Sequence, residues 1–190
     1  MAYTTVGDVR KHAGISEASS DELIKTKIDG AQTWIDNFCH RTFEASVDST
    51  RYFDYSRKYV DGLTLWMDDE IAAITTVTNG DGIEVASDEY TTIPRSETPY
   101  TKIRILSNSG KQWQYTDEWM NAISITGKWA YSEEAPADIV EACIQVATFL
   151  FRAKDAPLID VTAIEAGVVI KTPGISKIAE KLLISGRVKP

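Results

Sequence analysis

Residues 19–38, which read SSDELIKTKIDGAQTWIDNF, decide the fold. Apolar side chains recur here at alternating intervals of four and three residues, at Ile24, Ile28, Ala31, Ile35 and Phe38. This spacing places them on one face of an α-helix over residues 20–39. We expect Ser19 to cap the helix, with Glu22 reaching back to the amide of the capping residue. Because isolated helices of this length are marginal in water, the apolar face must pack against a partner.

The best candidate for that partner is a second helix over residues 136–154. Pro136 suits the first position of a helix, where its missing amide hydrogen would have no acceptor anyway. Arg152 and Lys154 stand at the end where positive charge is favoured. The apolar face of this helix consists of Ile139, Cys143, Val146, Ala147, Leu150 and Phe151.

A shorter helix over residues 5–13 is predicted at the start of the chain, with Thr5 as its cap and Gly14 as its stop. Between residues 43 and 131 the apolar period shortens to two, which is typical of strands. Strand-like stretches occupy residues 51–55, 63–67, 71–78, 90–93, 102–106 and 123–131. Residues 79–82 form a turn. The sequence therefore predicts an α+β fold, in which two long helices and a short N-terminal helix form a small bundle with an inserted antiparallel β subdomain.

The end of the chain differs from the rest in charge. Residues 171–190 hold five basic side chains and one acidic side chain, a net charge of +4, which leaves -12 for the remainder of a chain whose total is -8. Thr172 and Pro173 can start an amphipathic helix over residues 173–185. We therefore divide the chain into a main domain, 1–154, and a C-terminal arm, 155–190. We expect the arm to dock on a partner rather than on its own core.

Signatures of catalysis, cofactor binding and metal binding are missing from the sequence. The chain has no glycine-rich phosphate loop, no nucleophile elbow and no paired histidines at helical spacing. Asp68, Asp69 and Glu70 form an acidic corner, which we interpret as a solvated turn. Cys39 and Cys143 are expected to be small buried side chains. We predict no catalytic, cofactor-binding or metal-binding residue, and the tryptophans are assigned to core and interface packing.

The beginning of the chain lacks the charged-then-apolar order of a signal peptide, and no apolar run reaches the length of a membrane span. Synthesis in the cytosol, with no membrane partner, is the expectation.

Four stretches, taken in this order, resemble the head-to-tail connector, or adaptor, family of long-tailed double-stranded-DNA bacteriophages. They are Thr5–Val9 with its glycine stop, Ala31–Phe43 (AQTWIDNFCHRTF), Thr50–Asp54 (TRYFD) and Gly127–Ala142 (GKWAYSEEAPADIVEA). Ala130 stands where the family pattern has a glycine between the tryptophan and tyrosine of the last strand.

The resemblance implies a structural virion protein, made in the host cytoplasm, with no enzymatic activity. It implies docking beneath the portal protein, assembly of copies into a ring that is commonly twelvefold, and contact with the next connector, stopper or tail protein. Double-stranded DNA would pass through the ring without specific binding. The family uses its C-terminal segment to reach the portal, which here points to Ile175, Lys177, Ile178, Lys181, Leu182, Arg187 and Lys189.

Two other functions remain open at this point. The basic arm and the tryptophans also fit a nucleic-acid-binding packaging accessory protein, whose affinity would fall steeply with salt. A small enzyme could use the acidic corner, or Asp54 together with Asp61, because adjacent carboxylates in one pocket can separate their pKa values.

Overall fold

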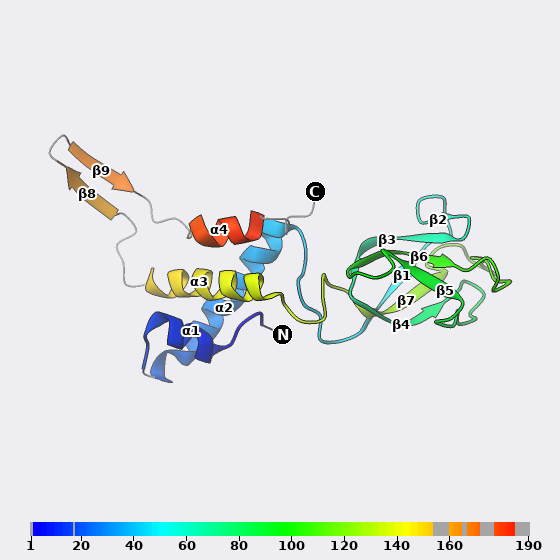
Figure 1. Cartoon of the computed structure of the whole chain (residues 1–190), viewed down its shortest axis with the longest axis horizontal. Coiled ribbons are helices and arrows are strands. Elements are labelled where there is room, and N and C mark those ends of the chain that lie inside the picture. The colour runs from blue at the N-terminus through cyan, green and yellow to red at the C-terminus, as the bar shows by residue number, and fades with distance from the viewer. Residues whose placement is uncertain (1, 17, 154–159, 165–166, 172–176, 185–190) are drawn as a thin grey trace. The chain divides into compact units, whose positions relative to one another are not determined.

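The computed structural model describes residues 2–16, 18–153, 160–164, 167–171 and 177–184 (Figure 1). The chain divides into two compact units, each described here by itself. The β unit spans Thr42–Glu134, and the helical unit combines Ala2–Arg41 with Ala135–Pro190. The mixture of helices and antiparallel sheets confirms the predicted α+β class.

The helical unit contains α1 (Val6–Ala13), α2 (Asp21–Cys39), α3 (Ala137–Arg152) and α4 (Lys177–Ile184). Helix α3 packs against the three other helices, as Figure 1 shows. Within the described residues, no helix combines the length and the apolar character that crossing a membrane requires.

The apolar face of α2 is buried as its spacing predicts. Ile24, Ala31, Ile35 and Cys39 are 0% exposed and Ile28 is 2% exposed. Facing residues of α3 are equally buried, namely Ile139, Ala142, Cys143, Val146 and Ala147. Burial of each large apolar side chain contributes on the order of 1.5–3 kcal/mol, so this contact dominates the stability of the unit.

The ends of the helices depart from the predictions in two places. A short 3-10 turn, Ala18–Ser20, precedes α2, and the capping residue is Ser20 rather than Ser19. Ser20 has helical backbone angles and makes no capping hydrogen bond with its side chain, because a side-chain cap requires an extended backbone. Pro136 lies one position before α3 rather than at its first position, since its ψ of 148° is extended.

Helix α1 has the predicted cap. The Asp8 amide donates to Thr5 Oγ1 at 3.2 Å, and the Thr5 amide donates to Asp8 Oδ2 at 3.4 Å. The Thr5 hydroxyl, which donates to Asp8 Oδ2 at 2.6 Å, and the Thr5 amide lower the pKa of the Asp8 carboxyl. Gly14 then ends the helix with a φ of 70°.

The β unit consists of two antiparallel sheets. The first sheet has the order β1 (Ser49–Phe53), β7 (Ile123–Lys128), β4 (Ala73–Thr78). The second has the order β2 (Val60–Asp61), β3 (Thr64–Ile71), β6 (Tyr100–Ile105), β5 (Tyr90–Ile93). The buried side chains of both sheets form one core with Trp113, which is 2% exposed and donates from its indole nitrogen to the Leu63 carbonyl at 2.9 Å.

One segment of strand structure was not predicted. Asp160–Ile164 (β8) and Gly167–Lys171 (β9) pair as an antiparallel hairpin. The run Val168, Val169, Ile170 is continuously apolar, so it lacks the alternation from which a half-buried strand is recognised.

The α2 packing yields a stability prediction. We expect Ile28→Ala to lower the free energy of unfolding by roughly 2–5 kcal/mol, because it removes buried methyl groups and leaves a cavity. Chemical denaturation of both proteins measures the change. Lys25→Ala, at an exposed position of the same helix, is the control and should change stability by less than about 0.5 kcal/mol. Equal effects of the two substitutions would contradict the packing.

A second prediction concerns the buried pair of Tyr3 and Asp36. Burial raises the pKa of the Asp36 carboxyl, while the Tyr3 hydroxyl, which donates to Asp36 Oδ1 at 2.5 Å, lowers it. Tyr3→Phe should therefore raise this pKa further, as measured by NMR titration. A folded-state pKa above the unfolded value means that the native state binds more protons there, so this carboxyl makes stability fall as pH rises from about 4. An unchanged or lowered Asp36 pKa in Tyr3→Phe would contradict this account.

Candidate partner-binding surfaces

The residues predicted to reach the portal fall on helix α4 and on its flanks. Lys181 is exposed on α4, while Ile175, Arg187 and Lys189 lie outside the described residues. Lys177, Ile178 and Leu182 belong to α4, but the structure describes only their backbone. Of the predicted set, the structure describes only the side chain of Lys181, and portal docking by these residues stays a prediction.

Helix α4 corrects the expectation that the C-terminal arm stands apart from the core. Ala179 and Leu183 are 0% exposed, and α4 packs on α3 and also contacts α2. Residues 179 and 183 are four apart and share one helix face, which therefore serves the chain's own core. The compact helical unit accordingly includes Ala135–Pro190, whereas the sequence suggested a division after residue 154. Ile184, 61% exposed, remains on the open side of the helix.

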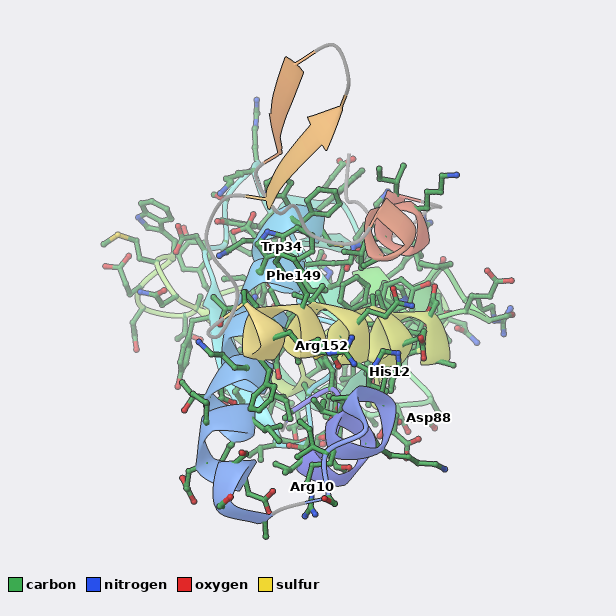
Figure 2. All side chains as sticks on the ribbon, turned by 90° about the vertical axis from the view of Figure 1, so that its left-hand side faces the viewer. Arg10, His12, Trp34, Asp88, Phe149 and Arg152 are labelled. Carbon is green, nitrogen blue, oxygen red and sulfur yellow. The ribbon has the colours of Figure 1, made fainter. Side chains whose placement is uncertain are left out.

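The start of the chain is tied to α3 by polar contacts as well. Arg152 donates to the Ala13 carbonyl at 3.2 Å, and His12 Nδ1 lies 3.1 Å from Thr148 Oγ1 (Figure 2). His40 takes the left-handed conformation, with a φ of 53°, at the end of α2. Both histidines are thus at helix ends. Phe151 and Arg152 end α3, which packs on α1.

The two cysteines are free and buried, which confirms their prediction as small core side chains. Burial raises the pKa of Cys39 to about 11 and that of Cys143 to about 12. Neither thiol has the lowered pKa that marks a reactive cysteine.

The acidic corner is not a turn. Asp68, Asp69 and Glu70 belong to strand β3, where the pairing register with β6 shifts between Trp66 and Ile71. Asp68 is exposed whereas Glu70 is 7% exposed, and Asp68 and Asp69 bind different partners, so the three carboxylates do not share one pocket. Asp68 accepts from the Tyr59 hydroxyl at 2.6 Å, and Asp69 accepts from Arg51 at 2.9 Å.

The carboxylates of Asp54 and Asp61 also lie in different surroundings. Asp54 Oδ1 accepts from the amide of Asn121 at 2.9 Å, and Asp61 is an exposed residue of β2. Among the described residues, no three His, Cys, Asp or Glu side chains are grouped so that they could hold a metal ion. The geometry thus offers no support for the small-enzyme hypothesis.

Two of the stretches that carry the resemblance meet in the first sheet. Ser49–Phe53 pairs with Ile123–Gly127, and the Thr50 and Thr126 hydroxyls lie 2.7 Å apart. The Trp129 indole donates to the Ser49 carbonyl at 3.0 Å, and the Arg51 guanidinium lies 4.5 Å from the centre of the Trp129 ring. The Arg51 guanidinium is thus stacked on the Trp129 ring, just beyond the end of strand β7.

The chain enters and leaves the β unit at one place. The Tyr131 amide donates to the Thr42 carbonyl at 2.9 Å, and the Ser132 hydroxyl donates to the Phe43 carbonyl at 2.9 Å. The rings of Phe43 and Tyr131 are 5.7 Å apart. The β unit is therefore an insertion whose two ends are joined by hydrogen bonds and ring packing.

The tryptophans divide into two groups. Trp113 and Trp129 are buried and satisfied by hydrogen bonds, and Trp34 stacks on Phe38 with ring centres 5.1 Å apart. Trp66 and Trp119, in contrast, are each 45% exposed. Other large apolar side chains that the β unit exposes are Val47, Tyr52, Ile83, Tyr115 and Met120. Sequence alone did not separate these groups, because the face that an aromatic residue occupies depends on strand register.

These features define an α+β protein whose described part exposes large apolar side chains on its β unit. Residues 3–91 match the family model described as phage gp6-like head-tail connector protein. This match confirms the resemblance to head-tail connectors that the ordered sequence motifs indicated. No curated protein matches the chain significantly.

Two solved structures share the fold. A chain in the neck of an empty GTA particle, computed with C6 symmetry, is 12% identical, with 96% of this chain and 92% of that chain covered and a TM-score of 0.55. A chain in the virion of a native gene transfer agent (GTA) particle is 15% identical, with the same coverage of both chains and a TM-score of 0.52.

Gly127, a residue of the motif, provides a test of the first sheet. A Cβ at this position would overlap the carbonyl oxygen of Ala73 on strand β4. We expect Gly127→Ala to destabilise the protein by at least the ~1–3 kcal/mol typical of overpacking.

Gly30→Ala is a control with the same chemical change. Its Cβ would meet only Leu150, at 3.9 Å, and alanine favours helix, so this variant should gain about 0.5–1 kcal/mol. Thermal unfolding followed by circular dichroism measures both variants. A tolerated Gly127→Ala would show that β4 and β7 do not approach this closely.

Proposed function

We propose that this chain is a non-enzymatic head-tail connector that docks beneath the portal, assembles into a ring and receives the next connector, stopper or tail protein. The observation that carries the proposal is the family match over residues 3–91, which includes α1, α2 and the first four strands. The location that follows is the head-tail interface of the virion.

Ring assembly is supported by the fold. A chain with this fold stands in a particle neck computed with C6 symmetry. A closed ring needs two different surfaces on each copy, because every copy contacts one neighbour with one surface and the other neighbour with the second. The β unit exposes enough large apolar side chains to build such contacts, and isolated aromatic residues of this kind often anchor interfaces.

The charge of the chain fits a passage for DNA. The net charge is -8, with -12 on residues 1–170 and +4 on the last twenty residues. A basic channel would bind phosphates through counterion release and hold the genome in place, whereas an acidic channel lets the DNA slide. We therefore propose that double-stranded DNA passes through the ring without specific binding.

Portal docking is assigned to the exposed side of α4 and to the basic residues around it. Ala179 and Leu183 attach α4 to α3, which holds the helix in a defined position, and Lys181 and Ile184 stay exposed. A firmly attached helix with a basic and apolar outer side can present these groups to a partner at a low entropic cost.

The test uses full-length protein and DNA-filled, tailless heads that carry the portal but lack this chain. We expect the protein to bind these heads at the portal vertex as a ring of about a dozen copies, seen by electron microscopy. Light scattering after size exclusion reports whether the ring also forms in solution. Absence of binding to the heads would refute the proposal.

A point substitution tests the role of α4. Deletion of residues 171–190 is unsuitable, because it removes Leu183 and Ala179 from the core. Lys181→Glu keeps the packing and should weaken binding to the heads roughly tenfold, which corresponds to about 1.4 kcal/mol. Lys25→Glu on α2 is the matched control and should bind like the wild type. Equal binding by both variants would remove α4 from the docking surface.

A further inference from the structure

The second sheet of the β unit has an outer face that is both basic and aromatic. In its register Trp66 pairs with Lys102 and Thr64 pairs with Arg104. Paired residues of antiparallel strands point to the same side of the sheet. Leu65, Ile103 and Ile105 alternate with them and are 0% exposed, so the core lies on the opposite side.

This outer face is open to solvent. Trp66 is 45% exposed, and Lys102 Nζ lies 3.5 Å from the centre of its ring. Arg104 is exposed beside them, and Arg57 and Lys58 line an open depression together with Trp66. Lys58 is already paired with Asp68, at 3.5 Å. We call Arg57, Trp66, Lys102 and Arg104 the basic-aromatic face.

A second surface of the same unit has the opposite charge. Residues 117–120, which read Asp-Glu-Trp-Met and which we call the acidic-aromatic loop, are all exposed, with Trp119 45% and Met120 51% exposed. The Tyr55 amide donates to the Trp119 carbonyl at 2.7 Å, and the Asn121 amide donates to Asp54 at 2.9 Å. The backbone of the loop is therefore held against the end of β1 while its side chains stay exposed, with Glu118 Oε1 accepting from the Met120 amide at 3.0 Å.

Neither surface is neutralised within its own copy. Among the residues that the structure describes, no ion pair involves Arg104, Lys102, Asp117 or Glu118. Exposed tryptophan and methionine side chains are enriched at protein interfaces, where tryptophan often acts as an anchor.

We propose that the acidic-aromatic loop of one copy docks on the basic-aromatic face of the next copy. Asp117 and Glu118 meet Lys102 and Arg104, and the apolar side chains of Trp119 and Met120 pack against Trp66. The two surfaces differ, so the contact is heterologous and repeats from copy to copy until a ring closes. Opposite charges steer the encounter and fix its register. The inference rests on the proposed function and names the partner surface within the ring.

Charge reversal in both directions tests the contact. Lys102→Glu with Arg104→Glu places like charges across the contact, and so does Asp117→Lys with Glu118→Lys. We expect either double variant to lower the number of rings on DNA-filled heads at least tenfold. The fourfold variant, which carries all these changes, restores opposite charges and should recover to within about threefold of the wild type. Lys11→Glu with Lys25→Glu, two exposed lysines of the helical unit, is the control and should assemble normally.

A cross-linking experiment gives an answer even if a charge variant folds poorly. A photoreactive phenylalanine in place of Trp119 should cross-link to residues 57–66 or 100–104 of another copy, as mapped by mass spectrometry on assembled rings. Cross-links to other segments only would overturn the inference.

The outcomes separate the two claims. If the wild type forms no ring on the heads, both the proposed function and the inference fail. If the wild type assembles and the double variants assemble as well, or the fourfold variant shows no recovery, the inference alone fails. If Lys102→Glu with Arg104→Glu abolishes a salt-sensitive affinity for DNA and leaves assembly unchanged, the face binds nucleic acid and the inference is overturned.

Discussion

The packing of α2 against α3 is the constraint on which the rest of the structure depends. The two helices bury their apolar faces against each other, although the whole β unit, Thr42–Glu134, lies between them in the sequence. Because α2 and α3 pack side by side, the two ends of the β unit inserted between them must also lie close together. The hydrogen bonds of Tyr131 to Thr42 and of Ser132 to Phe43 provide this closure.

This arrangement gives the two units different tasks. The helical unit is stabilised by one continuous apolar core, which α4 extends with Ala179 and Leu183. The β unit has its own core and keeps several aromatic side chains on its surface. The match to head-tail connectors over residues 3–91 includes parts of both units.

The sequence failed where the outcome depended on strand pairing or on distant packing. Asp68–Glu70 looked like a turn because three acidic residues are rare in strands, yet they belong to β3, whose pairing with β6 is interrupted after Trp66 and resumes at Ile71 with a shifted register. Helix α4 looked separate from the core because its charge differs from that of the rest of the chain. Ala179 and Leu183, on one face of α4, are nevertheless buried and attach it to the helical unit. In hairpin β8–β9, strand β9 is continuously apolar at Val168–Ile170 and had no alternation to reveal it.

Local patterns by themselves determined the helices and the family resemblance. The period of Ile24, Ile28, Ala31 and Ile35, the cap at Thr5 and the stop at Gly14 each depend on neighbours within one or two helical turns, so they are legible in the chain. The surfaces were decided only in the tertiary structure. Trp66 meets Lys102, and Trp129 meets Arg51, through sheet pairings between residues far apart in sequence, and a slip of one residue would turn each side chain to the other face.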